Sequence, residues 1–89
     1  MNWRIDFSAS SLKFIERNHL EESLIVDNIK LVLRKFQGEN ININIKKMKG
    51  KWEGFYRIRD GKLRIIAEFH FENFRVYIEQ IDWRGNAYK

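Results

Sequence analysis

At residues 56–66 the chain reads YRIRDGKLRII, and this stretch predicts a β-hairpin. The Asp-Gly pair at 60–61 is a strong turn signal, and arginine alternates with apolar residues before it. Alternate side chains of a strand point to the same face, so Arg57 and Arg59 share one face of the predicted sheet. Arg64 joins them from the returning strand. A row of fixed guanidinium groups predicts a phosphate ligand, because their planar fork matches phosphate oxygens.

Composition narrows the class of protein. The 89 residues predict one small domain spanning 1–89. The chain has no cysteine, which excludes disulfides and thiolate metal sites, and no apolar run approaches the length of a membrane span. Its first residues lack the basic region and apolar core of a signal peptide, so a cytoplasmic protein is expected. No metal or organic cofactor is expected.

Positive charge is concentrated in the second half of the chain. The net charge is +5; residues 1–43 carry six Lys/Arg and six Asp/Glu, whereas residues 44–89 carry eleven and six, so 11 − 6 accounts for all of it. Four lysines open this half, namely Lys46, Lys47, Lys49 and Lys51. The distribution favours a polyanionic partner such as RNA, with a merely basic, solvated surface as the alternative.

Two helices are predicted after a short strand at 3–7. Ser8 is a suitable N-cap for a helix over 9–18, which is expected to bury Leu12 and Ile15. Residues 20–37 predict a longer helix, because apolar residues recur there at spacings of three and four. Asn18-His19 and Gly38 are the expected breaks.

Three further strands are predicted at about 53–59, 63–71 and 74–82, joined by tight turns. The order of strand, two helices and antiparallel meander indicates an α+β domain whose helices cover one face of the sheet. Residues 39–45 alternate between Asn and Ile, which is consistent with an extra strand or a connector. The connector is the favoured interpretation.

The period of two predicts which side chains lie on the other, open face of the sheet. In the strand that begins at residue 63, Leu63 and Ile65 are expected to face the helices. In the last strand the side chains should alternate from Phe74 to Trp83, so that Ile81 and Trp83 point to the open face, away from the helices. The open face then combines cationic and aromatic side chains, which suits backbone phosphates and unstacked bases. Its expected members are Arg57, Arg59, Arg64, Glu68, Arg75 and Tyr77, with Trp83 and Arg84 nearby.

Four segments, in this order, resemble the RelE/ParE toxin superfamily of type II toxin–antitoxin systems. Residues 5–8 (IDFS) with the two helices resemble the family's first strand and helical hairpin, and residues 47–50 (KMKG) resemble its basic Lys-Leu-x-Gly segment. Residues 56–66 resemble its Tyr-Arg-Ile-Arg-x-Gly-x-Tyr-Arg stretch, and residues 82–88 (DWRGNAY) its terminal Gly-His-Arg-Arg-x-x-Tyr. The resemblance covers nearly the whole chain and implies the same α+β fold.

The RelE branch of this superfamily contains ribosome-dependent endoribonucleases, or mRNA interferases. The resemblance implies that Arg57 and Arg59 bind phosphate and assist proton transfer, and that Arg64 stabilises the scissile phosphate. It places Arg84 at the C-terminal arginine of the site and Tyr88 at a tyrosine implicated in stacking or proton transfer. Metal-independent attack by the RNA 2′-hydroxyl is the implied reaction.

Two sets of residues complete the prediction. Arginine hardly deprotonates, so the general base is sought among Tyr88, Glu68 and His70, with Tyr88 favoured by the resemblance. Contacts to RNA or the ribosome are expected from Lys46, Lys47, Lys49, Lys51, Arg75, Tyr77 and Trp83.

The chain departs from the family pattern at two positions, and other functions stay open. Trp83 replaces a frequent histidine, and Ala67 replaces a frequent tyrosine. The ParE branch shares the fold but inhibits DNA gyrase, and an inactive relative would bind only an antitoxin or RNA. A toxin of the RelE branch implies the ribosome, mRNA and a cognate antitoxin as partners. We expect the antitoxin to wrap the arginine face with an acidic segment.

Overall fold

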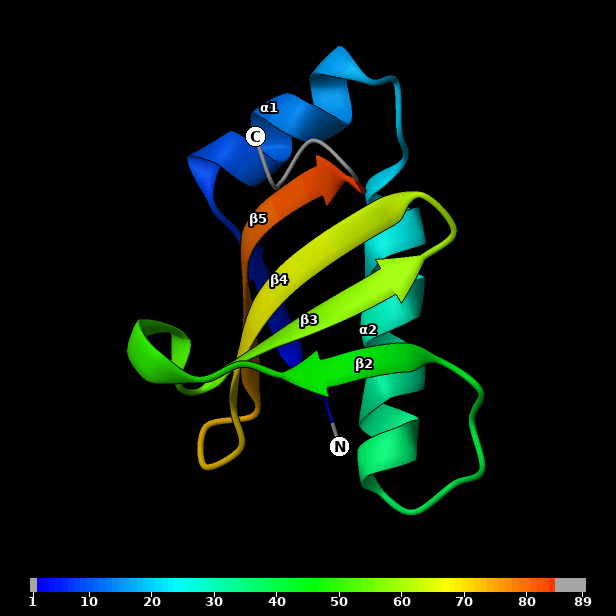
Figure 1. Cartoon of the computed structure of the whole chain (residues 1–89), viewed down its shortest axis with the longest axis vertical. Coiled ribbons are helices and arrows are strands. Elements are labelled where there is room, and N and C mark those ends of the chain that lie inside the picture. Colours follow the sequence, from blue (N-terminus) through cyan, green and yellow to red (C-terminus); the bar gives the residue numbers. More distant parts are fainter. Residues whose placement is uncertain (1, 85–89) are drawn as a thin grey trace.

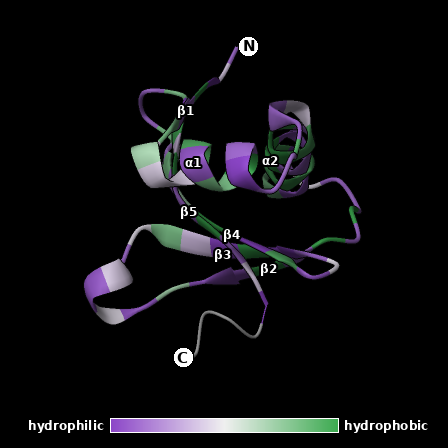
Figure 2. Cartoon of the chain, turned by 90° about the horizontal axis from the view of Figure 1, so that it is seen from above, coloured by the Kyte–Doolittle hydropathy of each residue, from purple (hydrophilic) through white to green (hydrophobic). Residues whose placement is uncertain are grey.

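Two helices lie on one face of a five-stranded mixed sheet in the computed structural model, which describes residues 2–84 (Figures 1 and 2). In chain order the elements are β1 (Arg4–Phe7), α1 (Ala9–Arg17), α2 (Glu22–Phe36), β2 (Asn44–Lys47), the 3-10 turn η1 (Gly50–Trp52), β3 (Phe55–Asp60), β4 (Leu63–His70) and β5 (Arg75–Trp83). The strand order is β1-β5-β4-β3-β2, with β1 parallel to β5 and all other pairs antiparallel. The predicted α+β architecture is confirmed. No helix within the described residues is long and apolar enough to cross a membrane.

The helices begin and end close to the predicted positions. The Ser8 side chain accepts a hydrogen bond from the Ser11 backbone N–H, which satisfies one free donor at the start of α1. His19 has a φ of 54°, which ends the helix at the expected break. Gly38, with a φ of 97°, follows α2 and adopts a left-handed conformation that suits glycine. The expectation for Leu12 is wrong: it is 42% exposed, because α1 is short and presents Ser11 and Ile15 to the sheet instead.

The core lies between α2 and the inner face of the sheet. Ile25, Ile29 and Val32 are fully buried, and they form the stripe that the helical spacing predicted. Ile58 and Ile78 are fully buried on the facing strands. Each such side chain stabilises the fold by about 1.5–3 kcal/mol when it is removed from water. This layer fixes which face of the sheet remains open.

The favoured interpretation of residues 39–45 as a connector is wrong at its C-terminal end. Asn44–Lys47 forms β2, an edge strand antiparallel to β3. Ile45 is half-buried and packs against the core opposite Ile58, so one side chain of the Asn/Ile alternation anchors the strand. The pairing places Lys46 directly opposite Arg57 and thereby extends the open face by one strand.

The side chains of β5 alternate between the two faces of the sheet, and this alternation shifts by one residue at Glu79. The prediction that Ile81 and Trp83 point to the open face is therefore wrong. Ile66 pairs with Gln80 but its neighbour Ala67 pairs with Ile78, so Glu79 is the extra residue of a β-bulge. Beyond the bulge, Ile81 is 3% exposed and belongs to the core.

Serines at the start of α1 satisfy the backbone of the bulge. The Ser8 hydroxyl donates to the Glu79 carbonyl oxygen over 2.8 Å, and the Ser11 hydroxyl donates to the Ile78 carbonyl oxygen over 3.1 Å. A bulge interrupts the regular ladder of a sheet, so these carbonyl groups need other partners. The sequence signal for the bulge is the three-residue spacing of Ile78 and Ile81, which breaks a period of two.

Candidate nucleic-acid interface

Four strands contribute side chains to adjacent positions on the open face of the sheet. Arg59 on β3 lies directly opposite Arg64 on β4, and Arg64 lies opposite Asp82 on β5. Two residues further along the sheet, Lys46 is opposite Arg57. We call the surface formed by Lys46, Arg57, Arg59 and Arg64 the cationic part of the open face. The pleat and the register therefore bring the three predicted hairpin arginines together.

Arg64 is largely enclosed by its neighbours. Its side chain is 13% exposed, and its guanidinium lies 3.6 Å from a carboxylate oxygen of Asp82, whose side chain is 29% exposed. Arg59 lies directly opposite, and two like charges at such positions repel each other. The Asp82 carboxylate offsets this repulsion on the other side of Arg64. Glu68, which also faces the open side of β4, pairs with His70 rather than with Arg64.

An apolar residue lies beneath the cationic part. Ile66 is 2% exposed, although it points to the open face, opposite Arg57 on one side and Gln80 on the other. Long polar side chains can cover apolar surface with their stems and keep their heads in water. The buried Nε atoms of Arg57 and Arg64 agree with this arrangement. Because the stems of Arg57 and Arg64 cover Ile66, their guanidinium groups are held close to the surface of the sheet.

A cavity of about 370 Å³ joins the arginines to the basic segment after β2. It is lined by Lys46, Lys47, Met48, Lys49, Arg57 and Arg64. Arg57 also donates a long hydrogen bond, 3.5 Å, to the Asn44 side chain. Lys51 lies beyond the cavity in η1 and is exposed. The structure thus brings three of the four predicted lysines next to the arginines.

Arg84 lies at the hairpin end of the cationic part. Its backbone N–H donates to the Lys62 carbonyl oxygen, and its guanidinium donates to the Gly61 carbonyl oxygen over 3.1 Å. Both contacts continue the β4–β5 pairing past Trp83 and place Arg84 beside the turn that follows Arg59. Tyr88, the fifth predicted catalytic residue, lies outside the described residues.

The other part of the open face has a mixed charge. We call it the mixed part, and it consists of Arg4, Asp6, Glu68, His70, Arg75 and Tyr77. Arg4 pairs with Asp6 over 3.1 Å, and His70 pairs with Glu68 over 3.1 Å. A cavity of about 290 Å³ lies among them. Within residues 2–84, no group of three or more His, Asp or Glu side chains is arranged to hold a metal ion.

The mixed part is separated from the hairpin arginines. Glu68 is four residues from Arg64 on the same strand, and a strand rises about 3.3 Å per residue, so the two are about 13 Å apart. His70 is further still. Arg75 and Tyr77 point to the open face as predicted, but they lie beside Glu68 and His70 rather than beside Arg64.

Trp83 lies on the helix side of the sheet and not on the open face. Its indole N–H donates to the Asn18 side-chain oxygen over 3.1 Å, and its ring centroid is 5.5 Å from that of Phe14. The bulge at Glu79 is the physical cause of this placement. The same shift turns Gln80 and Asp82 to the open face, and sequence reasoning missed both.

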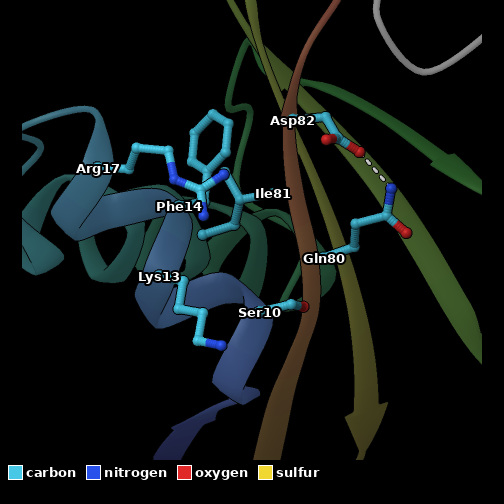
Figure 3. A pocket seen from close by; sticks show the side chains of 7 residues that line it. All are labelled: Ser10, Lys13, Phe14, Arg17, Gln80, Ile81 and Asp82. Carbon is cyan, nitrogen blue, oxygen red and sulfur yellow. Dashed lines mark hydrogen bonds between the residues drawn. The ribbon is translucent and has the colours of Figure 1, made fainter.

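A further cavity, of about 440 Å³, lies between α1 and β5 (Figure 3). Its lining consists of Ser10, Lys13, Phe14, Arg17, Gln80, Ile81 and Asp82. Gln80 donates a hydrogen bond to the Asp82 carboxylate, and both side chains point away from α1 (Figure 3). This cavity therefore borders the cationic part through Asp82.

The clearest pKa shifts among the described residues lie away from the open face. At the end of α2, Arg34 donates a 2.9 Å hydrogen bond to Glu39. This hydrogen bond lowers the pKa of Glu39 and raises that of Arg34, and their mutual attraction acts in the same direction. The pair is exposed, so it anchors the chain after α2 without contributing to the candidate site.

Comparison with known proteins gives matches only at the level of structure. No protein-family model and no curated protein matches the sequence. Among solved structures, the RelB–RelE antitoxin–toxin complex from Methanococcus jannaschii matches with 27% identity over 93% of this chain and 94% of that chain, at a TM-score of 0.58. The Escherichia coli DinJ–YafQ toxin–antitoxin complex matches over 100% of both chains, with 11% identity and a TM-score of 0.67. The RelBE2 toxin–antitoxin complex from Mycobacterium tuberculosis matches over 94% of this chain and 100% of that chain, with 15% identity and a TM-score of 0.61.

The chain therefore has the fold of the RelE-like toxins. The matches extend over nearly the full length of both partners in each comparison, so they include the sheet, both helices and the open face. The match to the RelB–RelE complex, at 27% identity, agrees with the resemblance to this superfamily that the sequence motifs indicated.

Proposed function

We propose that this protein is the toxin of a type II toxin–antitoxin system and cuts mRNA on the ribosome. The observation that carries the proposal is the arrangement of Arg57, Arg59 and Arg64 on adjacent strands, with Arg84 at their end, on the fold of RelE-like toxins. The neighbouring toxins were solved with their antitoxins, RelB and DinJ. By analogy, a cognate antitoxin is the first partner of this chain, and the cytoplasm is its compartment.

The proposed reaction is attack by the RNA 2′-hydroxyl on the adjacent phosphorus. The new O–P bond forms as the bond to the 5′-oxygen breaks, giving a 2′,3′-cyclic phosphate and a 5′-hydroxyl. A base accepts the 2′-hydroxyl proton, and an acid gives a proton to the leaving 5′-oxygen. Arg64, enclosed and oriented, stabilises the extra negative charge of the phosphorane, and Arg57 and Arg59 hold the phosphate.

Proton transfer is assigned to Tyr88 in this proposal. Glu68 and His70 were the alternatives on chemical grounds, but they lie about 13 Å or more from Arg64 along β4. A general base acts within hydrogen-bonding distance, about 3 Å, of the proton that it removes. That separation disfavours both residues for a reaction at Arg64.

The lysines are proposed to bind ribosomal RNA or the mRNA backbone. Lys46, Lys47 and Lys49 line the cavity that ends at Arg57 and Arg64, so a strand of RNA can reach the arginines along them. Contacts of this kind are independent of sequence and weaken with salt. An acidic segment of the antitoxin would compete for the same cations.

Primer extension on an mRNA that is being translated in a purified system tests the proposal. We expect cuts in phase with the codons in the presence of the wild-type protein, and intact mRNA with Arg64→Ala and Arg84→Ala. Arg34→Ala is the matched control, because it removes an exposed arginine of α2 that is remote from the open face. Intact mRNA with folded wild-type protein would overturn the nuclease. Inhibition of DNA supercoiling by the same preparation would then identify a gyrase inhibitor.

A further inference from the structure

The Arg64–Asp82 pair is an unusual feature of a surface proposed to bind RNA. A carboxylate at the edge of the cationic part repels a polyanion and so lowers the affinity for RNA. Yet Asp82 is 3.6 Å from Arg64, and both side chains are largely buried by their surroundings. A structural reason for this carboxylate therefore has to come from its effect on Arg64.

Asp82 is itself held in place. Gln80, two residues earlier on β5, donates a hydrogen bond to the carboxylate (Figure 3). Both residues face the open side because of the bulge at Glu79, whose carbonyl oxygen accepts a hydrogen bond from Ser8. A chain of contacts thus runs from the start of α1 through β5 to the guanidinium of Arg64.

The charges around Arg64 give Asp82 a specific role. Arg59 lies directly opposite Arg64 on β3, and two like charges at such positions repel each other. Asp82 lies directly opposite on the other side, on β5. Its attraction acts against the repulsion and restricts the guanidinium to one orientation, which lowers the entropy lost when a phosphate binds.

We propose that Asp82, held by Gln80, is a positioning residue that orients Arg64 toward the scissile phosphate. The inference rests on the proposed nuclease function and deepens it. Asp82 does not touch the substrate in this account. It raises the rate of the chemical step at the expense of affinity for the RNA.

Asp82→Asn is the direct test, because it removes the charge and keeps the shape. We expect single-turnover cleavage of ribosome-bound mRNA to fall by about 100-fold, as for other small losses of alignment. Binding of a fluorescent single-stranded RNA oligonucleotide should be as tight as wild type or tighter. Asp6→Asn is the matched control: it makes the same chemical change on the mixed part of the same face and should leave the cleavage rate unchanged. Unchanged cleavage by Asp82→Asn, or equal losses of cleavage and affinity, would overturn the proposal.

Two further measurements keep the inference separate from protein stability and from the nuclease itself. Gln80→Met removes the hydrogen bond to Asp82 but no charge, and it should lower the cleavage rate in the same direction by a smaller factor. The side-chain nitrogen NMR signals of Arg64 should be separate in the wild type, where rotation of the guanidinium is restricted, and averaged in Asp82→Asn. If the wild type does not cut mRNA, the proposed function fails, and these signals still decide whether Asp82 orients Arg64. Identical Arg64 signals in the two proteins would overturn the positioning role.

Discussion

The cationic and mixed parts of the open face share one sheet but differ in how their charges are arranged. In the cationic part the neighbours across the strands are cations: Arg59 lies opposite Arg64, and Lys46 lies opposite Arg57. The Asp82 carboxylate borders Arg64 from β5. In the mixed part, acidic and basic side chains are interspersed: Arg4 pairs with Asp6, and Glu68 contacts His70. Neighbouring guanidinium groups can together bind the oxygens of one phosphate. The two parts therefore differ in whether neighbouring side chains carry like or opposite charges, and not in the number of polar residues.

The boundary between the two parts lies on β5, at the bulge. Before Glu79, Arg75 and Tyr77 face the mixed part; after it, Gln80 and Asp82 face the cationic part. If Glu79 took a regular place in the alternation and formed no bulge, Ile81 and Trp83 would occupy the open face instead. The bulge at Glu79 thus determines both that Ile81 lies in the core and that Asp82 lies beside Arg64.

Ile81→Asp should break this division and have the largest effect. Ile81 is 3% exposed in the core, so the substitution loses about 1.5–3 kcal/mol of apolar burial and also buries an unpaired carboxylate. That loss is comparable with the total stability of a small domain. We expect a largely unfolded protein by circular dichroism and urea titration. Glu79→Ala, at the bulge itself, should remain folded, and a stable Ile81→Asp variant would show that Ile81 does not belong to the core.

Ser8→Ala should destabilise the bulge at this boundary while the protein remains folded. The Ser8 side chain caps α1 and also donates to the Glu79 carbonyl oxygen, so we expect a loss of about 1–2 kcal/mol in the free energy of unfolding. The matched variant is Ser10→Ala, an exposed serine on the same helix turn with a longer contact of 3.4 Å to the same oxygen. Its cost should be at most about 0.5 kcal/mol. Equal costs in denaturant titrations would contradict the special role of Ser8.

Lys46→Ala should sharpen the contrast in charge. Removing one phosphate contact is expected to make the logarithmic dependence of RNA affinity on salt shallower by about 0.7–1. Lys30→Ala is the control, because Lys30 is exposed on α2, on the opposite side of the sheet. Binding of a single-stranded RNA oligonucleotide at several salt concentrations gives both slopes. A change of slope in Lys30→Ala alone would place the RNA on the helical side.

Substitutions in the Glu68–His70 pair should have the smallest effect. Because the pair lies about 13 Å or more from Arg64, we expect Glu68→Gln and His70→Ala to change the cleavage rate by no more than about twofold. Single-turnover rates across the pH range around neutrality provide the measurement. A large loss in either variant would assign proton transfer to the mixed part.

The sequence predicted those parts of the fold that depend on local patterns. The Asp60-Gly61 turn, the Ser8 cap and the apolar stripe of α2 each act within a few residues, and the structure confirms them. A connector was favoured over the strand β2 because the pairing of β2 with β3 depends on a partner about a dozen residues away. The direction of Ile81 was missed because the bulge is satisfied by serines some 70 residues earlier in the chain.

The candidate site divides in the same way. Alternation within one hairpin correctly placed Arg57, Arg59 and Arg64 on a common face. It gave no information on the distance between that group and Arg75, which depends on the register between strands. It also predicted Trp83 on the open face, where the structure places Asp82, because the faces of both residues depend on the bulge.

The most direct test of the account compares one arginine from each part of the open face. Arg64→Ala and Arg75→Ala remove the same charge from neighbouring strands, and their single-turnover cleavage rates can be measured on the same stalled ribosomes. The account predicts a loss of about 100- to 1,000-fold for Arg64→Ala and a change of no more than about twofold for Arg75→Ala. Equal losses in the two variants, or a loss in Arg75→Ala alone, would contradict the claim that the cationic part is the site of RNA cleavage.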